Sequence, residues 1–201
     1  MHDPRIARLL EHPALWRGRS AARLPTLPSG FAALDAALPG GGWPRHGLIE
    51  ILIPRFGSGE LTLLLPTLAA LSRGAQARWC VWVAPPYLPF APALVAGGVV
   101  LGRVAVVGGQ KPLWAFEQVL GSGACDAALA WSRSPKARDV RRLQLAAERG
   151  RTLGVLFRPQ RAARCASPAA LRLAVSAAGA TLRVQLIKGR GARGAVELAL
   201  P

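Results

Sequence analysis

Residues 57–63 read Gly57-Ser58-Gly59-Glu60-Leu61-Thr62-Leu63, and they lie where a buried strand, Leu48 to Ile53, turns into a leucine-rich helical run, Leu61 to Leu71. A strand, a glycine-rich turn and a helix in this order are typical of a phosphate-binding loop, whose pattern is G-x-x-x-x-G-K-S/T. The last glycine of the pattern falls on Gly59, and the lysine position holds Glu60. A carboxylate at about 4 Å from a phosphate repels it by about 4 kcal/mol at an effective dielectric near 20. The loop therefore predicts a nucleotide-binding fold that does no nucleotide chemistry.

Two further positions of this loop depart from the phosphate-binding pattern. Its first glycine falls on Pro54, and the position that normally carries a metal-binding hydroxyl holds Leu61. The degenerate loop comprises Pro54, Gly57, Ser58, Gly59, Glu60, Leu61 and Thr62. We therefore expect no catalytic residue, no nucleotide cofactor and no metal here.

The rest of the chain alternates strand-like and helix-like segments. Apolar runs typical of strands lie at 79–83, 104–107, 127–131 and 153–157, and helical patterns lie at 89–96, 112–120 and 140–149. Three more apolar runs follow at 171–175, 182–187 and 195–200, and the last two resemble an antiparallel pair. Strands that alternate with helices of this length indicate βαβ units. We predict an α/β fold with a mainly parallel central sheet flanked by helices and a C-terminal β-hairpin. It forms a single domain, 25–201, after a basic N-terminal arm, 1–24.

Charge is distributed unevenly along the chain. The formal net charge is +16, and 51% of the 201 residues are hydrophobic, which argues against disorder. Residues 1–131 contain 11 Lys or Arg and 7 acidic residues, whereas residues 132–201 contain 15 and 3, a net charge of +12. A domain this basic suggests a nucleic acid or an acidic protein as partner, and a merely solvated basic face is the alternative.

Cysteine usage and hydropathy indicate the compartment. Cys80, Cys125 and Cys165 stand far apart, which indicates free thiols in a reducing compartment and no metal site. The apolar stretch at 91–102 is shorter than a bilayer span, and the first residues do not resemble a signal peptide. We expect a cytoplasmic protein without a membrane partner.

Several segments together resemble one family. These are 27–38 with the glycine run after it, 79–94, 113–125 and 141–148. They are similar to the ImuA-like proteins associated with translesion DNA synthesis, which belong to the RecA-like superfamily. The resemblance covers residues 25–201. The SulA family of division inhibitors has a similar build and is the competing resemblance.

The resemblance allows the ATPase site to be compared position by position. A RecA-type ATPase needs a lysine on the phosphates, a glutamate that orients water and an aspartate near the magnesium ion. The matching positions here hold Glu60, Pro85 and Trp131. The resemblance thus implies a RecA-like core with a degenerate nucleotide site and no ATP hydrolysis.

An ImuA-like protein is a non-catalytic adaptor in damage-induced (SOS) mutagenic translesion DNA synthesis. The partners that this implies are an inactive Y-family polymerase homologue (ImuB-like), an error-prone replicative-type DNA polymerase, the RecA recombinase and single-stranded DNA. Two alternatives stay open: a SulA-like inhibitor that binds the tubulin-like division protein, and a residual RecA-like ATPase. No cofactor is implied.

Two basic loops stand where RecA-like proteins carry their DNA-binding loops. The candidate DNA-binding residues are Arg133, Lys136, Arg138, Arg158, Arg161 and Arg164. Arg and Lys on loops neutralise phosphates without reading sequence. An acidic protein partner and plain solubility are the alternatives for these loops.

A further pair of cations is a candidate partner-facing site. Lys188 and Arg190 match the two cations that a RecA subunit contributes to its neighbour's nucleotide site. The resemblance implies a face that docks on a recombinase filament, and an ordinary basic turn is the alternative.

Overall fold

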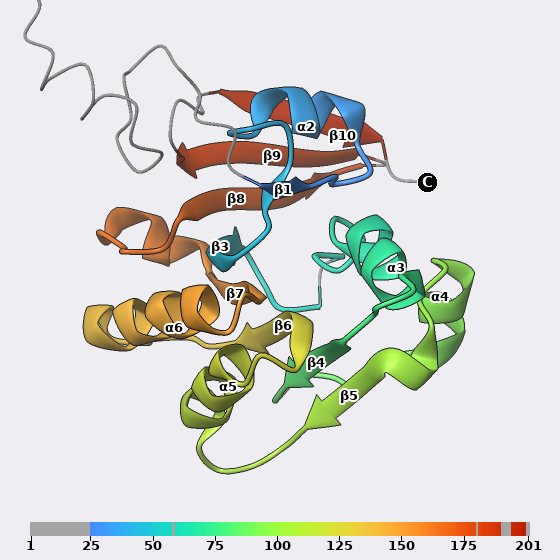
Figure 1. Ribbon diagram of the computed structural model, residues 1–201. Helices are drawn as coiled ribbons and strands as arrows, with labels where there is room; N and C mark the ends of the chain where they lie inside the picture. The colour runs from blue at the N-terminus through green and yellow to red at the C-terminus, as the bar shows by residue number, and fades with distance from the viewer. Residues whose placement is uncertain (1–24, 58, 180, 190–193, 200–201) are drawn as a thin grey trace, which may run out of the picture.

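The fold is built on one large sheet. A computed structural model describes residues 25–57, 59–179, 181–189 and 194–199. The strands of the sheet are β3 (Gly47–Ile53), β4 (Trp79–Val83), β5 (Val104–Val107), β6 (Cys125–Trp131), β7 (Leu153–Pro159), β8 (Leu171–Ala178), β9 (Thr181–Lys188) and β10 (Ala195–Ala199). They lie in the order β10-β9-β8-β3-β7-β6-β4-β5 (Figure 1). The mixed α/β class with a mostly parallel sheet is confirmed.

Strand β3 lies inside the sheet and determines much of its order. All seven of its residues are buried, and it pairs in parallel with β7 on one side and β8 on the other. A strand covered on both faces reads as a continuous apolar run, which is the pattern of this segment. Strands β8, β9 and β10 pair antiparallel, so the expected C-terminal hairpin is present with β8 as a third member.

Helices cover both faces of the sheet. One face carries α2 (Ala32–Ala37), α3 (Leu65–Arg73) and α4 (Ala91–Ala96), and the other carries α5 (Pro112–Gly121) and α6 (Ala137–Arg149) (Figure 1). Because side chains alternate along a strand, Ile49 and Ile51 of β3 join the first core and Leu48 joins the second. A two-stranded sheet of β1 (Thr26–Leu27) and β2 (Trp43–Pro44) precedes β3.

The start of α3 differs from the expectation. The sequence pattern predicts a helix from Leu61, but α3 begins at Leu65, and turns occupy the residues before it. Pro66 lies in the first turn of the helix. Proline has no N–H to donate and its ring clashes with a preceding helical turn, so it is tolerated only there. The segment 54–64 is therefore a longer loop than expected.

The fold places several loops at one edge of the sheet. Because β3, β4, β6 and β7 are parallel, the loops at their carboxyl ends leave the same edge, which we call the carboxyl edge. In open α/β sheets this edge is where ligands usually bind. Two short 3-10 turns, η1 (Leu101–Arg103) and η2 (Gln160–Arg164), complete the described elements. Within the described ranges no helix is long and apolar enough to cross a membrane.

Candidate functional site

Three of the predicted site residues meet at the carboxyl edge. Glu60 is only 4% exposed, and its Oε1 accepts hydrogen bonds from the Gly57 N–H at 2.9 Å and from Trp131 Nε1 at 3.2 Å. Backbone N–H groups of such a loop bind phosphate oxygens in nucleotide-binding proteins. In this chain its own carboxylate accepts the Gly57 hydrogen bond. The second carboxylate oxygen, Oε2, is buried and has no hydrogen-bond partner among the described residues.

Aromatic rings fill the space beside this carboxylate. Trp131 stacks on Phe157 with ring centroids 4.9 Å apart and an interplanar angle of 22°, and Trp82 lies 6.0 Å from Trp131. All three rings are buried. The ends of β4, β6 and β7 therefore meet in an apolar cluster, which includes Trp131, the residue that the sequence resemblance predicts at the aspartate position.

The loop after β4 packs against the loop after β3. The Tyr87 ring lies so close to Gly57 that a Cβ on this glycine would come within 2.6 Å of Tyr87 Cε2. Gly57 also has a φ of 81°, which side-chain-bearing residues rarely adopt. Pro85 lies in the loop after β4. It directly follows Ala84, whose φ of 47° is positive and therefore uncommon for a residue other than glycine.

The other residues of the predicted degenerate loop are exposed or half-buried where the structure describes them. Pro54 and Gly59 are exposed, and Leu61 and Thr62 are half-buried. Thr62 continues the chain through a turn in which its N–H donates to the Gly59 carbonyl at 3.0 Å. Ser58 lies outside the described residues, as do the N-terminal arm, 1–24, and Arg190.

Five of the six candidate DNA-binding cations are exposed at the carboxyl edge. Arg133 and Lys136 follow β6, Arg138 begins α6, and Arg161 and Arg164 belong to η2. The two loops start together, because the Ser132 N–H donates to the Phe157 carbonyl at 3.0 Å. The Arg133 guanidinium lies over the Phe56 ring, 5.4 Å from its centroid.

Arg158 is the exception, and the expectation of a DNA contact for it is wrong. Strand β7 continues to Pro159, so Arg158 belongs to the sheet and its side chain is buried. Its Nη1 lies 2.5 Å from Oε1 of Glu50, whose other oxygen accepts from Arg172 Nε at 2.6 Å. Glu50 is fully buried. A buried carboxylate needs paired cations, so the guanidinium of Arg158 is not available to a ligand.

Sequence reasoning missed this Glu50–Arg158–Arg172 cluster. The signal is a glutamate inside an apolar strand, which must find a cation when the strand is buried. Arg172 lies directly opposite Glu50 in the register of β3 and β8, a pairing that only the structure shows.

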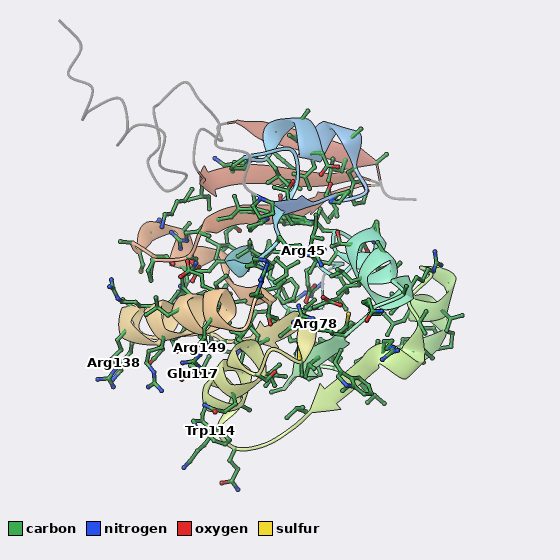
Figure 2. All side chains as sticks on the ribbon, viewed as in Figure 1. Arg45, Arg78, Trp114, Glu117, Arg138 and Arg149 are labelled. Carbon is green, nitrogen blue, oxygen red and sulfur yellow. The ribbon has the colours of Figure 1, made fainter. Side chains whose placement is uncertain are left out.

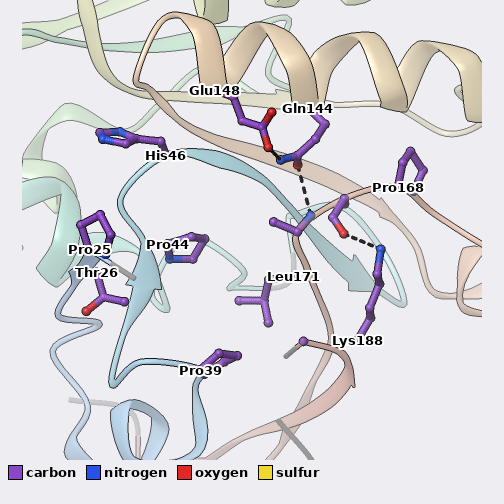
Figure 3. A pocket seen from close by; sticks show the side chains of 13 residues that line it. Pro25, Thr26, Pro39, Pro44, His46, Gln144, Glu148, Pro168, Leu171 and Lys188 are labelled. Atoms are coloured by element: carbon purple, nitrogen blue, oxygen red, sulfur yellow. Dashed lines mark hydrogen bonds between the residues drawn. The ribbon is translucent and has the colours of Figure 1, made fainter. Parts of the chain in front are cut away.

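Lys188 lies at the opposite edge, beside a cavity of about 620 Å³ (Figure 3). Its Nζ donates to the Ser167 carbonyl at 2.7 Å and to the Ala169 carbonyl at 2.8 Å. Burial and the nearby Arg172 lower the pKa of Lys188. The ammonium group therefore holds its own chain in place, which favours the ordinary structural role over a partner-facing one.

Prolines and polar residues line the same cavity. Four prolines, among them Pro44 and Pro168, line it together with His46, Gln144 and Glu148. The Gln144 side chain connects the walls of the cavity. Its Oε1 accepts from the Ala170 N–H and its Nε2 donates to Glu148 (Figure 3). The same Oε1 also accepts from the Leu48 N–H. Burial and the cationic Arg151 lower the pKa of His46. In the described part of the chain no three His, Cys, Asp or Glu side chains group to hold a metal.

The other unusual surface is apolar. Of the ten large hydrophobic residues that are exposed in the described ranges, eight lie between Trp79 and Val106. Leu88 is 90% exposed and Phe90 is 71% exposed. The sequence from 79 to 110 contains a single charged residue, Arg103. We call this surface, formed by the loop after β4, α4, η1 and β5, the apolar edge (Figure 1).

Comparison with known proteins identifies the family. No protein-family model matches the chain. The cell division inhibitor SulA of Edwardsiella piscicida is 35% identical over 122 residues, which cover 58% of this chain and 71% of that protein. SulA of Serratia proteamaculans is 30% identical over 135 residues, 65% of this chain and 79% of that protein.

The chain belongs to the SulA family of cell division inhibitors. A shorter match joins it to RecA of Bacillus licheniformis, with 43% identity over 62 residues, 30% of this chain and 18% of that protein. The crystal structure of SulA from Pseudomonas aeruginosa is similar with a TM-score of 0.47 and 24% identity, over 55% of this chain and 97% of that one.

The family corrects the principal functional expectation. The assignment to ImuA-like proteins is wrong, because curated relatives at 30–35% identity are SulA division inhibitors. The adaptor role in translesion synthesis, which this assignment implied, is therefore wrong as well. The same holds for the partners that it implied, which were the two polymerases, the recombinase and single-stranded DNA. The competing resemblance was the correct one.

Proposed function

We propose that this protein inhibits cell division by binding the tubulin-like division protein through its apolar edge. The observation that carries the proposal is the concentration of exposed hydrophobic side chains on a segment with one charge, in a chain of net charge +16. Exposed apolar surface of this kind marks protein interaction sites. The names of the relatives supply the kind of activity.

The geometry of the apolar edge suits a protein partner. Strand β5 ends the sheet, so one row of its backbone groups is free of sheet pairing. Val106 of β5 and Val95 of α4 are both exposed. The core of a protein interface is depleted of charge and enriched in aromatic and aliphatic residues, and Tyr87 and Phe90 are of this type.

We further propose that the chain acts without catalysis. Glu60, Pro85 and Trp131 stand where a RecA-type ATPase needs lysine, glutamate and aspartate, and none of them can replace the lost group. The RecA-like assignment of the core rests on the 62-residue match to RecA and on the glycine loop that follows β3. We also propose that residues 25–201 form one domain and that the protein acts in the cytoplasm.

The proposal is tested with purified division protein. The wild-type chain should suppress its GTP-dependent polymerisation, measured by light scattering. Leu88→Asp and Val106→Asp should each weaken inhibition by about tenfold or more, because a central interface residue contributes about 2 kcal/mol or more. Both side chains are exposed, so the substitutions should leave the melting temperature nearly unchanged.

Leu145→Asp is the matched control. Leu145 is 54% exposed and lies on α6, away from the apolar edge. This variant should inhibit like the wild type. The proposal fails if the wild type leaves polymerisation unchanged, or if all three variants inhibit equally well.

A further inference from the structure

The loops after β6 and β7 carry a surface that the proposed function does not use. Arg133, Lys136, Arg138, Arg161 and Arg164 form it, and we call it the basic edge. We propose that the basic edge binds an acidic, carboxylate-rich protein segment. This inference does not depend on the identity of the partner at the apolar edge.

The two loops are held together by the sheet. Trp131 and Phe157 lie opposite each other in the parallel register of β6 and β7. One residue further, the Ser132 N–H donates to the Phe157 carbonyl. Arg133, Lys136 and Arg138 therefore follow the end of β6, and Arg161 and Arg164 follow the end of the adjacent strand β7, at the same edge of the sheet.

The cations of the basic edge are largely unneutralised. Among the described residues, Arg133, Lys136, Arg161 and Arg164 form no ion pair with a carboxylate. Asp139 is the acidic residue nearest in sequence, and its carboxylate accepts the Lys136 N–H at 3.0 Å and lies 3.8 Å from Arg138 Nε. Arg138 remains exposed at the start of α6 (Figure 2). A ligand with several carboxylates would supply the missing charge.

A buried residue fixes the turn that presents two of these cations. Arg172 donates from Nη2 to the Ala162 carbonyl and from Nη1 to the Cys165 carbonyl, both at 2.8 Å. Its Nε is held by Glu50. The turn η2 is thus tied to a buried ion cluster through Ala162 in its middle and Cys165 directly after it, so Arg161 and Arg164 project from a fixed backbone. Preorganisation of this kind lowers the ordering cost of binding.

The surroundings favour carboxylates over nucleic acid. Proteins that bind single strands without sequence preference combine cations with aromatic rings on which bases stack. Here Trp131 and Phe157, which border the loops, are buried, and Arg133 covers the ring of Phe56. Carboxylates need no stacking surface, because arginine binds them through paired N–H groups.

The test measures binding of a fluorescently labelled oligoglutamate peptide by anisotropy, with an unlabelled oligothymidylate of equal charge as competitor. The edge variant replaces Arg133, Lys136, Arg161 and Arg164 by Ser. The control variant replaces four other exposed cations by Ser: Arg73, Arg103, Lys111 and Arg183. It removes the same amount of charge from other parts of the surface. All eight side chains are exposed, so melting temperatures should confirm that both variants fold.

The wild-type chain should bind oligoglutamate, and the edge variant should lose about tenfold or more in affinity while the control variant stays close to the wild type. Equal losses in both variants would show that net charge alone binds the peptide, and the proposal would be wrong. No binding by the wild type, or preferential displacement by oligothymidylate, would overturn it as well.

Discussion

Glu50 shows how one side chain can constrain the order of a sheet. Its carboxylate sits in the middle of β3 and is reached by Arg172 from β8 and by Arg158 from β7. A buried charge costs several kcal/mol unless it is paired. An arrangement in which either neighbour of β3 were replaced would leave part of this cluster unpaired. We infer that the three residues favour the observed order β8-β3-β7 over other pairings.

Glu50→Gln should lower the free energy of unfolding by about 3–5 kcal/mol, because it leaves two buried guanidinium groups without their counter-ion. Urea unfolding followed by circular dichroism measures the loss. Glu117→Gln is the matched control, since Glu117 pairs with the largely exposed Arg142 at 2.7 Å and such surface pairs contribute about 1 kcal/mol or less. Similar losses in the two variants would contradict the role assigned to Glu50.

At the scale of single elements, α6 depends on a cap at its first turn. Asp139 accepts the backbone N–H of Lys136, which precedes the helix. The carboxylate also lies near the positive end of the helix dipole. Because the basic edge begins here, the same cap orients Lys136 and Arg138.

Asp139→Ala should reduce stability by about 1 kcal/mol, within the range of about 0.5–2 kcal/mol for lost caps. Amide hydrogen exchange should accelerate mainly in the first turn of α6. Asp139→Asn keeps an acceptor oxygen and should lose less than the alanine variant. Identical losses for Asn and Ala would assign the effect to charge and not to the hydrogen bond.

Elements were predictable where apolar runs end at glycine or proline. The strands 79–83 and 104–107 have the predicted bounds, and α5 differs by one residue. Errors arose where a local signal competes with a distant contact. Arg158 looked like a loop cation because β7 was expected to end at Phe157, whereas its pairing with Glu50 extends the buried strand.

The candidate site was predictable in part. The degenerate loop and Trp131 could be named from the resemblance, but the hydrogen bond between Glu60 and Trp131 joins residues 71 positions apart, which no local pattern indicates. The apolar edge was visible as an uncharged stretch, yet only the structure separates its exposed side chains from core residues such as Leu94. The family was misassigned because the choice between ImuA-like and SulA-like proteins rested on a resemblance alone, and the curated relatives decide for SulA.

At the scale of the whole molecule, loops that follow three strands of the sheet meet around Glu60. The Glu60 carboxylate accepts the Gly57 N–H, Tyr87 lies against Gly57, and Trp131 occupies the end of β6. Each of these contacts opposes a phosphate group by charge or by volume. Together they lead us to propose that this fold does not bind nucleotide.

The melting temperature measured with saturating Mg-ATP should therefore equal the melting temperature measured with tripolyphosphate. A bound ligand at a hundredfold excess over its Kd raises stability by about 2.7 kcal/mol, which a thermal melt detects. Tripolyphosphate is the control, because a chain of net charge +16 gains stability from any polyanion. An upward shift specific to ATP would contradict the proposal that the fold does not bind nucleotide.

The order of the sheet separates charge across the molecule. The strands β4 and β5 and the helix α4 carry almost none and lie at one end, whereas the segments from β7 to β10 hold much of the +12 of residues 132–201 and extend to the other end. Such a chain is an electric dipole, and the field of an acidic molecule exerts a torque on it during diffusional encounter. At an ionic strength of about 0.15 M this torque acts over about 8 Å. The acidic partner proposed above would therefore be steered towards the cationic side of the molecule, and the apolar edge would remain free for a second molecule at the same time.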